Sequence, residues 1–109
     1  MNDRLLSFLG LCRRAGKLVI GNDPVRESID TDKALLVIIA SDISQNTYKK
    51  ISTVIETSGV PYYRINRTKD EISFNLGKAC AILSVTDKGF ADKLTELIKA
   101  EQKKEETTI

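Results

Sequence analysis

The run Leu35-Leu36-Val37-Ile38-Ile39-Ala40 is an unbroken apolar stretch about a third of the way along the chain. A strand that is apolar on both faces is usually a central strand, covered by helices on both sides of its sheet. We therefore predict that this stretch forms the centre of an α/β fold and that the rest of the chain is arranged around it.

Apolar patterns on either side of this run predict further strands and helices. Three more strands are expected, over residues 17–20, 60–65 and 80–85. Helical spacing of apolar residues predicts five helices, over about 3–15, 24–30, 44–58, 68–78 and 89–100. Asp42 or Ser44 is expected to cap the third helix, a capping box at 68–71 the fourth, and Asp87 the last. This alternation predicts an α/β sandwich with helices on both faces of a small sheet.

Length and composition fit a single globular domain. The chain has 109 residues, of which 41% are hydrophobic and 29% charged. We place one α/β domain over residues 1–100 and expect residues 101–109, which alternate in charge, to form a frayed tail. The formal net charge is only +2, so any nucleic-acid site must come from local clustering of basic side chains.

Several kinds of chemistry have no support in the sequence. The chain has no histidine, and its two cysteines, Cys12 and Cys80, form no Cys-x-x-Cys pair, so we expect neither a metal site nor histidine-dependent catalysis. There is no glycine-rich nucleotide loop, so we expect no cofactor and no enzymatic activity. The cysteines are expected to be buried free thiols of a cytoplasmic protein. No apolar run reaches the length of a membrane span, so we expect no membrane partner.

The stretch from Arg13 to Arg26 carries the strongest functional signal. It reads Arg13-Arg14-Ala15-Gly16-Lys17-Leu18-Val19-Ile20-Gly21-Asn22-Asp23-Pro24-Val25-Arg26. Asp23 before Pro24 predicts a helix start, with Asp23 as the N-cap and proline at the first helical position. The positive end of such a helix, placed beside basic side chains, suits a phosphate group. We predict that this turn contacts an RNA backbone and that Asn22 and Asp23 reach base edges. The alternative is an ordinary capped surface helix.

Five segments along the chain form a recognisable series. They are Leu9-Gly10-Leu11-Cys12-Arg13-Arg14-Ala15-Gly16-Lys17-Leu18-Val19-Ile20-Gly21, Lys33-Ala34-Leu35-Leu36-Val37-Ile38-Ile39-Ala40-Ser41-Asp42, Gly59-Val60-Pro61-Tyr62-Tyr63, Leu76-Gly77-Lys78-Ala79-Cys80 and Ser84-Val85-Thr86-Asp87-Lys88-Gly89-Phe90-Ala91-Asp92-Lys93-Leu94. In this order they resemble the ribosomal L-seven-Ae family of small kink-turn RNA-binding proteins, and the last segment looks most like its bacterial YlxQ-type branch. The resemblance extends from about Arg4 to Ile98.

The resemblance implies both a fold and a function. The fold is a three-layer α-β-α sandwich with a four-stranded mixed sheet. The function is the binding of a kink-turn, a sharply bent RNA helix with sheared G·A pairs, by a ribosome- or translation-associated protein. In the family, the turn before the second helix carries Gly-x-Asn-Glu-x-x-Lys or a close variant. Its amide and carboxylate read guanine edges, and its lysine meets phosphate.

This chain departs from that pattern at the turn itself. Aligned on the glycine without a gap, Asp23, Pro24 and Glu27 take the asparagine, glutamate and lysine positions. Proline has no group that bonds a base, and a glutamate repels phosphate. Shifted by one residue, Asn22, Asp23 and Arg26 supply amide, carboxylate and cation in the family's order. The sequence leaves both registers open.

A second departure follows the fourth segment, where Cys80 leads almost directly into the last strand. The apolar loop that the family places there, against the flipped-out nucleotide of the kink, is shortened or lost. We expect a basic rim around the turn to support RNA binding instead. The predicted RNA-binding residues are Lys17, Gly21, Asn22, Asp23, Arg26, Lys33 and Lys78.

A different role for the same fold stays open at this point. The small net charge and the altered turn favour a protein–protein adaptor with weak or no structure-specific RNA binding. In either case we expect a monomer.

Overall fold

The computed structural model describes residues 3–106, with side chains up to residue 103. Along this part of the chain the elements are α1 (Arg4–Arg14), β1 (Leu18–Ile20), α2 (Asn22–Asp30), β2 (Leu36–Ile39), α3 (Gln45–Ser58), β3 (Tyr62–Arg64), α4 (Lys69–Leu76), β4 (Ile82–Val85) and α5 (Lys88–Glu106). Every predicted helix and strand is present, with shifts at the ends of several.

The sheet is mixed, with strand order β1-β4-β2-β3. Strand β4 runs antiparallel to both of its neighbours, and β3 runs parallel to β2 at the edge. All residues of β2 and β4 are buried. The apolar stretch 35–40 therefore contains a central strand, as predicted.

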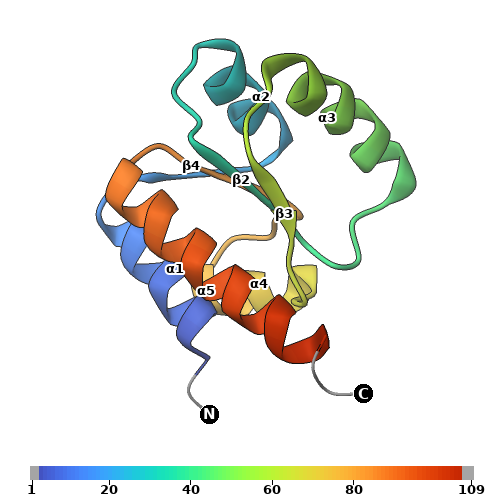
Figure 1. Cartoon of the computed structure of the whole chain (residues 1–109). Helices are drawn as coiled ribbons and strands as arrows, with labels where there is room; N and C mark the ends of the chain where they lie inside the picture. Colours follow the sequence, from blue (N-terminus) through green and yellow to red (C-terminus); the bar gives the residue numbers. More distant parts are fainter. Residues whose placement is uncertain (1–2, 107–109) are drawn as a thin grey trace.

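Alternation along β2 divides the core into two layers. Leu36 and Ile38 pack into the cluster formed by α1, α4 and α5, whereas Val37 and Ile39 pack into the cluster formed by α2 and α3. Figure 1 shows α2 and α3 on one side of the sheet and α1, α4 and α5 on the other. This is the predicted three-layer α-β-α sandwich with a four-stranded mixed sheet.

The caps of α3 and α4 settle the two alternatives that the sequence left for α3. Ser44 is the N-cap of α3, and its Oγ accepts from the backbone N–H of Thr47 at 3.2 Å. Asp42 is not the N-cap of α3. Its Oδ1 instead accepts from the backbone N–H of Lys69 at 2.8 Å. Asp42 thus ties the loop after β2 to the first turn of α4, whose predicted capping box is also formed.

Helix α5 is longer than predicted. Asp87 accepts from the N–H of Phe90 at 3.0 Å and so marks the predicted start, but the helix continues past Ala100 to Glu106. Arg67 supports this extension, because its Nη2 lies 2.9 Å from Glu101 while its Nε lies 2.6 Å from Asp3. The first part of the segment expected to fray is therefore helical, and residues 107–109 lie outside the described residues.

No helix within residues 3–106 combines the length and the apolar character needed to cross a bilayer.

Candidate functional site

Four connections meet at one edge of the sheet. The N–H of Gly21 donates to the carbonyl of Ile82 at 3.2 Å, and the N–H of Ala40 donates to that of Ala81 at 2.9 Å. The N–H of Ile65 donates to the carbonyl at the end of β2 in the same way. The segments that follow β1, β2 and β3 and the one that precedes β4 therefore lie together. We call this side, formed by residues 21, 40–44, 65–68 and 77–81, the loop edge.

Gly21 sets the start of α2 at this edge. Its φ of 106° and ψ of 161° belong to a region that only glycine adopts readily, and its carbonyl accepts from the N–H of Val25 at 3.0 Å. The helix accordingly begins at Asn22, with Gly21 as the N-cap. The prediction that Asp23 caps this helix is wrong, because the cap uses no side-chain hydrogen bond. Pro24 is the third helical residue, where its missing N–H has no intrahelical partner to lose.

A cleft of about 130 Å³ lies between the first turns of α2 and the first turns of α3. Its lining residues are Asn22, Asp23, Arg26, Thr47, Lys50 and Ile51. We call it the α2–α3 cleft. Three of the predicted RNA-binding residues thus share one wall, and α3 supplies the opposite wall. Pro24 and Glu27 do not line the cleft.

The polar side chains of the α2 wall are available to a ligand. Asn22, Asp23 and Arg26 are exposed, and none of them has a side-chain hydrogen bond or ion pair within the described part of the chain. The carboxylate that the sequence assigned to capping is consequently free to accept from another molecule. One short turn therefore presents an amide, a carboxylate and a guanidinium to the same small space.

Lys78 also lies at the loop edge, in the connection from α4 to β4. Burial raises the pKa of the neighbouring Cys80 thiol, and the positive charges of Arg13 and Lys78 partly offset that rise. Both cations therefore lie close to this connection. Lys78 and Ala79 are exposed while Cys80 is buried, so residues 77–81 present no large apolar side chain to solvent. This agrees with the shortened apolar loop that the sequence predicted.

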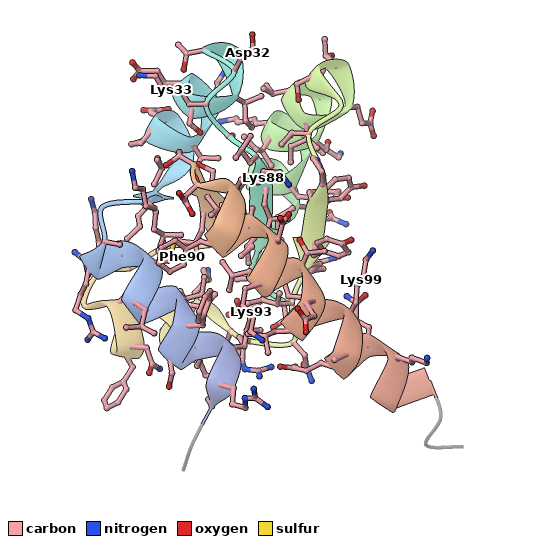
Figure 2. All side chains as sticks on the ribbon, turned by 60° about the vertical axis from the view of Figure 1, so that its left-hand side comes forward. Asp32, Lys33, Lys88, Phe90, Lys93 and Lys99 are labelled. Atoms are coloured by element: carbon pink, nitrogen blue, oxygen red, sulfur yellow. The ribbon has the colours of Figure 1, made fainter. Side chains whose placement is uncertain are left out.

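Two of the predicted residues lie elsewhere. The carbonyl of Lys17 accepts from the N–H of Thr86 at 3.0 Å. Thr86 follows the last residue of β4, so Lys17 lies at the end of the sheet opposite the loop edge. Lys33 precedes Leu35, whose N–H donates to Val85 at that same far end. Figure 2 shows Lys33 beside Asp32 in the turn that follows α2. The structure does not assemble Lys17 and Lys33 with Arg26 into one basic rim around the turn.

The sequence missed the α3 side of the cleft. Thr47 and Lys50 lie between the apolar residues of α3, on the part of its surface that a sequence pattern assigns only to solvent. Their participation depends on how α2 and α3 pack against each other. The sequence offers one signal for this wall of the cleft. A lysine and a hydroxyl residue lie in the first two turns of the helix that follows the central strand.

A larger hollow of about 500 Å³ lies at the opposite edge, between β3 and α5. Leu35, Pro61 and Tyr63 supply much of its apolar lining, and Lys88 and Lys99 are its cations. The ammonium of Lys88 lies 3.1 Å from Asp92, so part of its charge is already compensated. This hollow is less suited to an anion than the α2–α3 cleft.

The chain is thus an α-β-α sandwich with a four-stranded mixed sheet and a polar, cation-bearing cleft beside one sheet edge. The chain belongs to the ribosomal protein L7Ae/L30e/S12e/Gadd45 family, which residues 3–95 match. The family resemblance predicted from the five segments is confirmed.

Individual relatives resemble the chain over most of its length. The RNA-binding protein YlxQ of Bacillus subtilis (strain 168) is 38% identical over 92 residues, which cover 84% of this chain and 91% of that protein. The RNA-binding protein YlxQ of Enterococcus faecium is 34% identical over 96 residues, 88% of this chain and 92% of that protein. Among solved structures, a protein of unknown function from Bacillus halodurans superposes with a TM-score of 0.82 at 29% identity, covering 90% of this chain and 99% of that one.

Proposed function

We propose that this protein binds structured RNA at its loop edge and recognises a kink-turn or a similarly bent helix. The family and the two bacterial relatives, which are named as RNA-binding proteins, support RNA as the ligand. The observation that carries the proposal is the meeting of Asn22, Asp23 and Arg26 in one cleft, where their side chains have no hydrogen-bond or ion-pair partner among the described residues.

Each of these side chains has a role in the proposed complex. The Asp23 carboxylate and the Asn22 amide oxygen accept hydrogen bonds from the amino and imino groups of guanine, and the Arg26 guanidinium binds phosphate. The start of α2 at Asn22 supports the shifted register, because Asn22, Asp23 and Arg26 line the cleft whereas Pro24 and Glu27 do not. Lys78 and Arg13 contribute further positive charge at the same edge.

The membership of ribosomal proteins in the family supports a role on the ribosome or in translation.

The short connection over residues 77–81 affects how tightly the protein holds a kinked RNA. Without a large apolar side chain there, the flipped-out nucleotide of a kink gains little stacking or packing energy. We therefore expect discrimination to come from the hydrogen bonds of Asn22 and Asp23.

Calorimetric titration with two RNAs tests this function. One RNA is a standard kink-turn, and the other is the same sequence with its G·A pairs replaced by Watson–Crick pairs. The proposal expects clearly tighter binding to the kink-turn. Equal weak binding to both RNAs would remove structure-specific recognition and leave contact with the backbone alone.

One observation favours a second candidate function, that of a protein adaptor. Phe74 on α4 is 90% exposed, and a shallow hollow beside it contains Asp70 and Glu71. An exposed aromatic side chain beside acids suits a partner with apolar and basic side chains better than it suits RNA. The association with such a partner should persist in a pull-down after nuclease treatment. The partner should be retained by the wild-type protein and lost with Phe74→Ser.

A further inference from the structure

Two cations from different helices face the α2–α3 cleft. Arg26 comes from the second turn of α2, and Lys50 comes from the second turn of α3. Within the described residues, neither side chain forms an ion pair, and Asp23 is the only acidic residue on the lining. The cleft therefore carries an excess of positive charge that the protein itself does not compensate.

The α3 wall also carries Thr47, whose hydroxyl has a proton to donate. The Oγ1 of Thr47 accepts from the Oγ of Ser44 at 2.8 Å, which fixes the position of that oxygen. No described residue accepts the Thr47 hydroxyl proton. The cleft thus presents a guanidinium, an ammonium and a hydroxyl donor, which together match the oxygens of a phosphate group.

The size of the cleft limits what it holds. A volume of about 130 Å³ is several times the ~30 Å³ share of one liquid water and is smaller than the pockets, roughly 300–1,000 Å³, that enclose small-molecule ligands. One phosphate group with its nearest water molecules fits this range. The cleft is also open to solvent beside Asn22, so a chain of nucleotides has access to it.

We propose that Lys50 of α3, together with Arg26 of α2, binds one backbone phosphate of the RNA, so that α3 forms a second wall of the RNA-binding surface. The inference rests on the proposed function and extends it to a helix that the sequence did not single out. Asn22 and Asp23 then lie beside an anchored phosphate. This positions the adjacent base for their hydrogen bonds.

The salt dependence of RNA binding isolates this contact. Each cation–phosphate ion pair adds roughly 0.7–0.9 to the slope of log affinity against log salt concentration. We compare the full wild-type chain with Lys50→Ala and with Lys49→Ala. Lys49 is the matched control, since it is the preceding residue of α3, is exposed and does not line the cleft.

Lys50→Ala removes one of the two cations on the shared phosphate and is expected to lower the slope by about the amount of one cation–phosphate ion pair, whereas Lys49→Ala should leave it unchanged. Between 50 and 200 mM salt, wild-type affinity should then fall about threefold further than that of Lys50→Ala. Lys50→Arg, which keeps the charge, should restore the wild-type slope. Because both lysines are exposed, the variants should keep the wild-type melting temperature, and measuring that temperature checks that they are folded.

The outcomes separate the two proposals. Equal slopes for Lys50→Ala and Lys49→Ala overturn the phosphate contact, even where the kink-turn is still preferred. A lower slope for Lys50→Ala without any preference for the kink-turn supports the contact and removes structure-specific recognition. A wild-type chain that binds neither RNA contradicts both proposals.

Discussion

The Oγ of Ser28 lies 2.8 Å from the Oγ of Ser84, and both side chains are buried. Ser28 uses its own hydroxyl proton on the carbonyl of Val25, at 2.6 Å, so Ser84 donates to Ser28. The pair joins the middle of α2 to the central strand β4. The helix that carries Asn22, Asp23 and Arg26 is thereby fixed to the sheet by a polar contact as well as by apolar packing.

Removing Ser28 should cost more than one hydrogen bond. Ser28→Ala leaves the buried Ser84 hydroxyl without its acceptor, which typically costs about 1–3 kcal/mol. The double variant Ser28→Ala/Ser84→Ala should lose less than the sum of the two single variants, because no unpaired donor stays buried. Urea unfolding of the three variants measures this, and strictly additive losses would show that the pair does not act as a unit.

Gly21 and Gly10 should respond in opposite directions to the same substitution. Gly21→Ala forces an L side chain into a φ of 106° and should destabilise the fold by about 1–3 kcal/mol. Gly10 lies inside α1, where an added Cβ meets no atom within 4 Å, so Gly10→Ala should stabilise it by about 0.5–1 kcal/mol. Thermal unfolding distinguishes the two. A harmless Gly21→Ala would mean that the turn before α2 tolerates another backbone conformation.

The contact between Asp3 and Arg67 should make the free energy of unfolding depend on pH in the acidic range. The hydrogen bond from Arg67 is the main reason that the pKa of Asp3 lies below its ordinary value of 3.8, with a further bond from the N–H of Leu6. Because the folded-state pKa is depressed, the stabilisation is fully present above about pH 4 and is lost as the pH falls through the lower folded-state value.

Asp3→Asn keeps a residue that caps helices well but removes the charge. Its free energy of unfolding should fall less than that of the wild type between pH 7 and pH 2. Asp92→Asn is the control, because the Lys88–Asp92 pair is largely exposed and contributes little. If Asp3→Asn and the wild type lose stability in parallel, the Arg67 contact is not a source of acid sensitivity.

The two cysteines should be slow to react in the folded protein. Burial raises the pKa of the Cys12 thiol to about 11, with a further contribution from Asp87, and burial also raises the pKa of Cys80. At pH 8 about one Cys12 thiol in a thousand is then ionised, and its sulfur has no access to solvent. Labelling with a thiol reagent should be slow in buffer and fast in denaturant. Rapid labelling of the native protein would show that α1 opens readily from the sheet.

Local signals in the sequence predicted most of the fold. The central strand, the capping box at 68–71 and the glycine that ends α3 each depend on neighbouring residues, so a pattern reveals them. The start of α2 is an exception. Asp23 and Pro24 form a strong cap signal, yet the backbone of Gly21 begins the helix earlier and places Val25 in the core.

The candidate site was only partly predictable, because its two walls come from separate helices. Asn22, Asp23 and Arg26 follow one another on α2, and the sequence singled them out. Lys50 joins them only through the packing of α2 against α3. Proximity along the chain also placed Lys17 near the turn in the sequence-based prediction. In the structure, strand β1 separates Lys17 from the loop edge.

Substitutions in the α2 wall should separate affinity from discrimination. Arg26→Ala removes a phosphate contact and should weaken binding to kinked and unkinked RNA alike. Asn22→Ala removes a base contact and should narrow the ratio of the two dissociation constants. An unchanged ratio for Asn22→Ala would count against the shifted register.

Mapping the amide resonances of isotope-labelled protein during titration with a kink-turn RNA tests the location of the binding surface most directly. The account predicts that the largest chemical-shift changes fall on residues 21–26, which include three lining residues of the α2–α3 cleft, and on Thr47 and Lys50 of its opposite wall. Lys33, Lys88 and Lys99, which are labelled in Figure 2, do not line that cleft. Changes concentrated at these three lysines, with residues 21–26 unaffected, would contradict the account.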